Sequence, residues 1–112
     1  MNDKRIILPL ADVFETENQY VITLDMPGTV KDSIQVVAEN DKLVVTADTS
    51  FKKDNWKAIV TEFDLGSYRR EFTIGNKVNR DNIVARYEAG ILTVELEKSE
   101  TVKPRKIEVK VA

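Results

Sequence analysis

The side chains of this chain that are best suited to catalysis are carboxylates. The sequence of 112 residues has no histidine and no cysteine. This excludes imidazole acid–base catalysis, thiol nucleophiles, disulfides and most zinc sites. A pair of carboxylic acids, as in glycoside hydrolysis, is the one common mechanism left open. The candidate residues are Glu62, Asp64, Glu88, Glu95 and Glu97.

The positions of these carboxylates are those that solubility alone would produce. In residues 92–97 (LTVELE), leucine and valine alternate strictly with threonine and glutamate. Successive side chains of a strand point to opposite faces, so this run predicts one buried and one solvated face. The glutamates belong to the solvated face. We therefore predict a protein that is not an enzyme and that needs no cofactor or metal.

The composition predicts one ordinary globular domain. Hydrophobic residues make up 42% of the chain, charged residues make up 32%, and the net charge is −2. A nucleic-acid-binding protein would need a basic surface, and the few basic residues near position 105 are expected to form a solvated tail. The longest apolar run near the N-terminus is residues 6–8, too short for a signal peptide or a membrane span. We expect a soluble, cytoplasmic protein that binds neither nucleic acid nor membranes.

The elements that position these side chains are expected to be strands. Residues 83–97 predict a hairpin with a turn at Glu88-Ala89-Gly90, and residues 34–47 predict a similar hairpin with a turn at Asn40-Asp41. Further strands are expected at 11–15, 19–25 and 67–74. Residues 29–32 and 79–81 are predicted to form single turns at most. The fold class is therefore all-β, with two hairpins that face each other.

Four features leave alternatives open. The apolar segment 6–10 either packs on its own domain or contacts clients and other subunits. The long loop 48–66 carries either an internal strand or a strand that adds to a partner's sheet, and periodicity favours the internal strand. Arg70, on an apolar strand face, either extends its head to solvent or pairs with another subunit. The alternating tail 106–112 either folds back or docks on another subunit.

Several motifs occur in the order typical of one family. Ala85, Gly90 and Leu92 form an A-x-x-x-x-G-x-L pattern, and QYVITLDMPG (19–28), LVVTA (43–47) and GSYRREF (66–72) precede it. Ile107 and Val109 close the series as an I-x-V tail. This ordered set, which covers residues 9–111, resembles the small heat shock protein (α-crystallin) family. The chain departs from the family at Gly75, where proline is common, and in having only about ten residues before the domain.

The resemblance implies an immunoglobulin-like antiparallel β-sandwich with three parts. These are an N-terminal arm (1–10), the sandwich (11–98, with the long loop 48–66) and a C-terminal extension (99–112). The resemblance also implies a homodimer that exchanges the strand on the loop, with dimer contacts at Trp56, Ile59, Val60 and Arg70. It further implies a groove that receives Ile107 and Val109. The groove residues are Ile34, Val36, Ala38, Ile83, Val84 and Ala85.

The function implied is that of an ATP-independent chaperone, a holdase that binds partly unfolded proteins and prevents their aggregation. It would act from dimers that assemble further through the tail. Tail and clients would compete for the groove edges, at Ile34, Val36 and Val84. The alternative is an adaptor or co-chaperone module that recognises one defined partner through the same sandwich.

Overall fold

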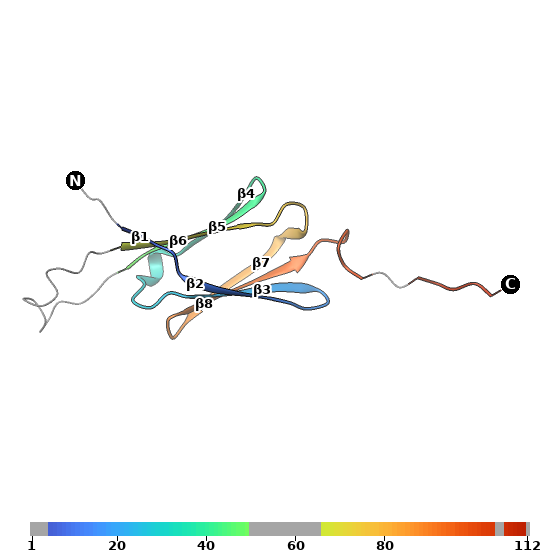
Figure 1. Ribbon diagram of the computed structural model, residues 1–112, viewed down its shortest axis with the longest axis horizontal. Helices are drawn as coiled ribbons and strands as arrows, with labels where there is room; N and C mark the ends of the chain where they lie inside the picture. Colours follow the sequence, from blue (N-terminus) through green and yellow to red (C-terminus); the bar gives the residue numbers. More distant parts are fainter. Residues whose placement is uncertain (1–4, 50–65, 105–106, 112) are drawn as a thin grey trace, which may run out of the picture.

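The computed structural model describes residues 5–49, 66–104 and 107–111, which form two stacked four-stranded sheets (Figure 1). The first sheet has the order β1-β6-β5-β4, and the second has the order β2-β3-β8-β7. One short 3-10 helix, η1 (Lys31–Ser33), precedes β4. The strands are β1 (Arg5–Ile7), β2 (Leu10–Glu15), β3 (Gln19–Asp25), β4 (Gln35–Glu39), β5 (Lys42–Asp48), β6 (Gly66–Thr73), β7 (Val78–Glu88) and β8 (Ile91–Lys98).

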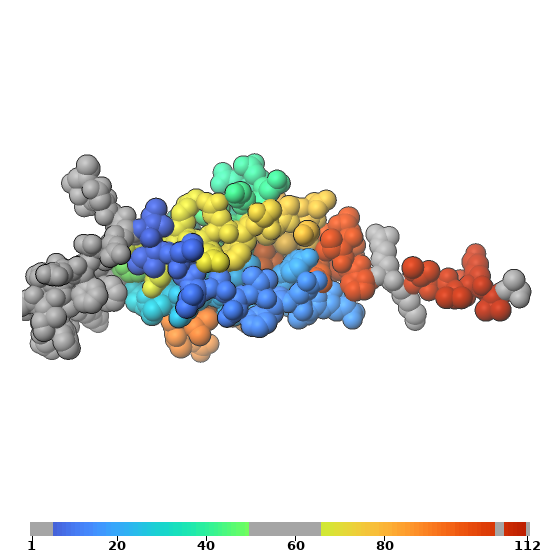
Figure 2. All heavy atoms as spheres, viewed as in Figure 1, coloured from blue at the N-terminus to red at the C-terminus, as the bar shows by residue number. Residues whose placement is uncertain are grey.

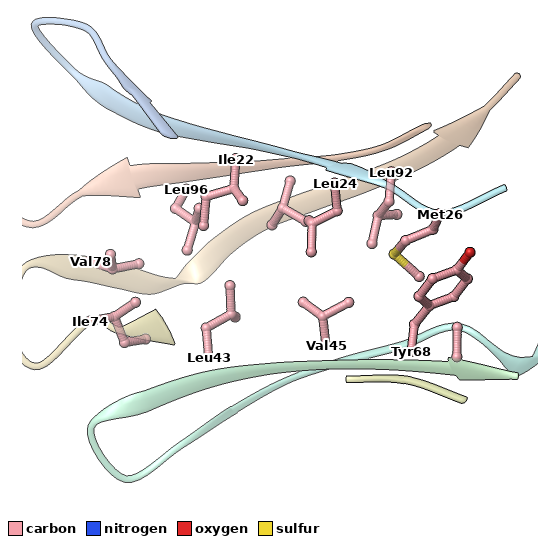
Figure 3. Packing of buried hydrophobic residues seen from close by; sticks show 12 residues of the cluster. Ile22, Leu24, Met26, Leu43, Val45, Tyr68, Ile74, Val78, Leu92 and Leu96 are labelled. Carbon is pink, nitrogen blue, oxygen red and sulfur yellow. The ribbon is translucent and has the colours of Figure 1, made fainter. Parts of the chain in front are cut away.

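The core lies between the central strands of the two sheets, as Figure 3 shows. Leu92, Val94 and Leu96 of β8 are at most 1% exposed, so the face predicted to be buried is confirmed. Leu43 and Val45 of β5 approach them from the other sheet and are equally buried. The predicted β-sandwich is therefore confirmed. Apart from the short parallel pair β1–β6, its strand pairs are antiparallel.

Strand β7 is longer than the sequence predicts. Residues 79–81, expected to form a turn, lie inside this strand. Val78 pairs with Lys98, but Ile83 already pairs with Leu96, so extra residues bulge out between them. A bulge interrupts the period of two from which a strand is predicted, and the expected turn at 79–81 is therefore wrong. The single turn expected near residues 29–32 is confirmed by η1.

The N-terminal segment crosses from one sheet to the other. Arg5–Ile7 pairs in parallel with β6, with Ile6 beside Ser67. Proline has no N–H to continue the ladder, and at Pro9 the chain passes to β2 in the second sheet. The segment therefore extends its own sheet, yet Ile6 and Leu8 remain 70% and 67% exposed.

Candidate functional site

Two edge strands line one open side of the sandwich. Strand β4 is the last of its sheet and β7 the last of the other. Val36 and Ala38 lie opposite the buried residues of β5, so they point between the sheets. Ile83, Ala85 and Tyr87 lie opposite the buried residues of β8 and point the same way. We call these five residues the inner edge rows.

The inner edge rows are only partly covered. Four of the five are half-buried and pack against the core cluster, as does Ile34, and Ala85 is exposed. Within the described part of the chain, β4 and β7 each pair with a strand on one side only. The other side of each strand presents backbone groups that an added strand can bind. This opening can therefore receive an extended peptide, with alternate side chains inserted between the rows.

A polar contact closes one end of this opening. There the guanidinium of Arg80 on β7 donates hydrogen bonds to the carbonyl oxygen of Asn40, in the β4–β5 turn, and to that of Gly75. The Tyr87 hydroxyl donates to the Met26 carbonyl oxygen at 2.8 Å, which ties β7 to the residue that follows β3 in its own sheet. Arg80 thus places the two edges on the same side of the sandwich. Its role could not be read from the sequence, because its surroundings were interpreted as a turn.

The structure brings together five of the six predicted groove residues. Ile34, Val36, Ala38 and Ile83 pack against the core, and Ala85 shares the inner face of β7. Val84 lies on the opposite face of β7, beside Glu95, and is 51% exposed. It is therefore outside the inner edge rows, although it neighbours two of their members in sequence.

The predicted docking tail is exposed and stands apart from these rows. Ile107 and Val109 are 82% and 81% exposed, and Val111 is 92% exposed. Figure 2 shows this segment beyond the end of the sandwich. Three alternating apolar side chains with this exposure form a surface that no other described part of the chain covers.

The three signature residues have different structural roles. Leu92 belongs to the core, and Ala85 to the inner edge rows. Gly90 has φ +82 in the β7–β8 turn, a conformation that glycine adopts without strain. Its carbonyl oxygen accepts a hydrogen bond from the Met26 backbone N–H at 2.8 Å, which ties the hairpin to the end of β3.

The opposite side of the sandwich is open as well. Strand β2 is the outermost strand of its sheet, and its Val13 and Phe14 are 58% and 55% exposed. A cleft of about 300 Å³ lies between β2 and the end of β6, lined mainly by apolar side chains from Val13, Tyr20, Ile22, Phe72, Ile74 and Leu96. The sequence interpretation missed this cleft, since its walls come from strands far apart in the chain.

Arg70 lies on this second open side and binds its own chain. It is half-buried, and its Nη1 donates to the Pro9 carbonyl oxygen at 3.1 Å. Its guanidinium carbon lies 5.7 Å from the centre of the Phe72 ring. Of the other predicted dimer contacts, Trp56, Ile59 and Val60 lie outside the described residues.

Comparison with known proteins identifies the family to which the chain belongs. Residues 12–110 match the Hsp20/alpha crystallin family. The chain belongs to this family. It is 34% identical over 106 residues to a probable 15 kDa heat shock protein of Leptospira interrogans, covering 95% of this chain and 81% of that protein.

Solved structures of small heat shock proteins share the fold. Heat shock protein 16.0 from Schizosaccharomyces pombe aligns with a TM-score of 0.72 and 27% identity, covering 95% of this chain and 76% of that one. A small heat-shock protein from Xylella fastidiosa, described as having a distinct high order structure, aligns with a TM-score of 0.70 and 26% identity, covering 92% and 96%.

The family membership confirms the resemblance that the motifs indicated. Small heat shock proteins are chaperones and not enzymes. Of the candidate carboxylates, Glu62 and Asp64 lie outside the described residues, while Glu95 and Glu97 lie on the outer face of β8. In the part of the chain that the structure describes, no helix is long and apolar enough to cross a membrane.

Proposed function

We propose that this small heat shock protein is an ATP-independent holdase that binds partly unfolded proteins through the inner edge rows. The observation that carries the proposal is the combination of free backbone edges and half-buried apolar side chains on β4 and β7. A partly unfolded client offers extended, apolar segments that fit such edges. Binding these segments competes with client self-association and requires no catalytic residue.

The same rows are proposed to receive the tail of another subunit. Ile107 and Val109 are two residues apart, so both can point between the rows when the tail is extended. Burial of one such side chain contributes roughly 1.5–3 kcal/mol before ordering costs are subtracted. A single tail would therefore bind weakly and reversibly. Assembly and client binding would then compete for the same surface.

Dimers are proposed to form on the other open side. The exchanged strand, with Trp56, Ile59 and Val60, would add to a partner's sheet. Strand β2 is the available outer edge there, and the adjacent cleft between β2 and β6 can take an apolar side chain. Arg70 supports this side of the sandwich by holding the crossover at Pro9.

The decisive experiment measures light scattering by several unrelated heated proteins, without nucleotide. Suppression of their aggregation is expected at comparable molar ratios. Failure to protect any of them would remove the holdase proposal, and protection of one partner alone would favour a specific adaptor. Deletion of residues 51–60 should give monomers if the loop carries the exchanged strand, and persistence of dimers would place the dimer contact elsewhere.

Two neighbouring residues provide a matched test of the site. Ala85→Asp puts a carboxylate on the inner face of β7 at an exposed position, so the core is spared. Val84→Asp puts the same group on the opposite face. We expect A85D to weaken both client protection and tail-dependent assembly, whereas V84D should resemble wild type. Equal effects of the two variants would contradict the assignment of the inner edge rows.

A further inference from the structure

The guanidinium of Arg70 lies inside the fold with donors to spare. Arg70 points inward from β6, since it lies opposite the buried Val45 of β5, and it is half-buried. In the described part of the chain it donates one hydrogen bond, to the Pro9 carbonyl oxygen, and pairs with no carboxylate. An arginine withdrawn from water is normally paired, because dehydrating its charge costs free energy. Its remaining N–H groups can therefore hold an anion.

An apolar cleft begins beside this guanidinium. The guanidinium carbon lies 5.7 Å from the centre of the Phe72 ring, and Phe72 is part of the wall of the 300 Å³ cleft between β2 and β6. Further wall residues, Ile22 and Leu96, lie at one end of the core in Figure 3. A volume of about 300 Å³ is at the lower limit of small-molecule sites, which are mostly apolar with a few polar groups. The cleft therefore has room for a short apolar chain whose polar end meets Arg70.

The charges around the cleft favour a ligand with a single negative charge. Pro9, which binds Arg70, precedes β2, whereas Glu15 ends it, so the two lie roughly 20 Å apart along the strand. Glu15 is paired with Lys98, and Lys77 at that end is exposed to solvent. One positive charge thus remains unbalanced at Arg70. A carboxylate supplies one negative charge and matches a guanidinium with two parallel hydrogen bonds, whereas a phosphate monoester carries about −1.5 to −2.

We propose that Arg70 and the adjacent cleft bind a medium-chain fatty acid. The carboxylate pairs with the guanidinium, and the alkyl chain lies between β2 and β6 against Phe72 and Val13. The Nη1 bond to Pro9 stays in place, because the carboxylate uses other N–H groups of the same side chain. Each methylene group that the cleft covers strengthens binding by a factor of about three to four. Binding therefore depends on the headgroup and on the length of the chain.

The test titrates the full chain with sodium octanoate, sodium decanoate and 1-octanol in a calorimeter, each below the concentration at which it forms micelles or separates. Saturable binding of one carboxylate per chain is expected. Decanoate should bind roughly tenfold more tightly than octanoate, because it has two more methylene groups. The neutral 1-octanol should bind more weakly than octanoate, because it cannot pair with Arg70.

Two pairs of neighbouring residues supply matched variants. Arg70→Gln should weaken octanoate binding about ten- to a hundredfold and leave 1-octanol binding unchanged. Arg69→Gln is its control, since Arg69 is exposed and pairs with Glu71 at 2.7 Å. Because R70Q also loses the bond to Pro9, Val13→Glu tests the cleft with that bond intact.

Val13 lies opposite the inward Ile22, whereas Phe14 lies opposite Val21 on the outer face of the same sheet. Val13→Glu should therefore abolish binding of both carboxylates, and Phe14→Glu should bind them like wild type.

The site is wrong if wild type shows no saturable binding, which is the result expected if a carboxylate of another subunit already holds Arg70. Equal affinities in V13E and F14E, or in R70Q and R69Q, would show adsorption to the surface and would also overturn it. One consequence rests on the proposed function: the ligand would compete with the partner's side chain for this cleft, so decanoate should shift the mass in solution toward monomers. Saturable binding with unchanged mass would support the fatty-acid site and contradict only the proposed dimer contact.

Discussion

Replacement of Lys98 by methionine should change the free energy of unfolding by no more than about 1 kcal/mol, although this side chain is buried. Lys98 continues the inward-facing series of β8, and its side chain is only 6% exposed. Its Nζ lies 2.7 Å from a carboxylate oxygen of Glu15 and 5.2 Å from the centre of the Tyr20 ring. The ammonium is therefore well paired at the end of the core.

Opposing contributions explain the small expected change. The pair with Glu15, which is 61% exposed, is worth roughly 0.2–1 kcal/mol, and the contact with Tyr20 roughly 0.5–1 kcal/mol. A methionine at this position makes neither of these interactions. It also avoids the free-energy cost of burying a charge, and this gain offsets a loss of this size. Lys98→Ala instead removes three methylene groups from a packed site, at about 0.8 kcal/mol each. We therefore expect alanine to cost about 2–3 kcal/mol.

Urea unfolding at one fixed protein concentration measures these differences, provided that the slope against denaturant is common to all variants. The same two substitutions at Lys42, which is 55% exposed beside Glu71, should change stability by less than about 0.5 kcal/mol. Glu15→Gln should destabilise wild type but not the methionine variant, because the ion pair is already absent there. If Lys98→Met destabilises the protein as much as Lys98→Ala, the charge of Lys98 and not the packing of its methylene groups stabilises the fold. That result would refute the reasoning.

Three further predictions concern the core, the signature turn and the surface. Leu92→Ala should lower the free energy of unfolding by about 3–4 kcal/mol in urea, since this side chain is 1% exposed; a change below 1 kcal/mol would contradict its place in the core. Gly90→Ala should lower the free energy of unfolding by about 1–2 kcal/mol in the same measurement, because alanine is strained at the positive φ of this turn. A steric clash does not contribute, since the atom nearest to a new Cβ would be Pro27 Cα at 3.6 Å. Burial raises the pKa of the Tyr68 hydroxyl, so its contribution to stability is complete below the unfolded pKa near 10 and is lost as pH rises through the folded value. In absorbance titrations the Tyr68→Phe variant should lose phenolate signal that appears above about pH 10 in wild type, and an unchanged curve in that range would argue against a raised pKa of Tyr68.

The elements with strict alternation could be predicted from the sequence. Residues 19–25 and 92–97 each have one face in the core and one in solvent, and both lie in strands at the expected positions. The start of β7 could not be predicted, because a bulge removes the period between Val78 and Ile83. The burial of Lys98 could not be predicted, since a lysine at the end of an alternating strand is expected in solvent, whereas here its side chain faces the core and pairs with Glu15.

The sequence predicts which side chains of a strand share a face, but it does not predict contacts between residues that are far apart in the chain. Val84 was included among the groove residues with Ile83 and Ala85, although alternation alone separates it from them, and it lies on the opposite face of β7. Arg70 was recognised as unusual on an apolar face. Its partner, the carbonyl oxygen of Pro9, is a backbone group 61 residues away, which no side-chain pattern reveals.

The central and edge strands differ in burial, and this difference is what the proposed exchange of tails and clients without unfolding requires. The most buried side chains, such as Leu24, Leu43 and Val94, come from β3, β5 and β8, each of which pairs with a strand on both sides. The half-buried residues that pack against the core include Val36 and Ala38 of β4 and Ile83 and Tyr87 of β7, and among the described strands β4 and β7 pair on one side only. Stability depends on the first group, so in the proposed function tails and clients would leave the second group while the core stays packed. Substitutions in the inner edge rows should therefore alter assembly more than folding, and substitutions in the central strands should do the reverse.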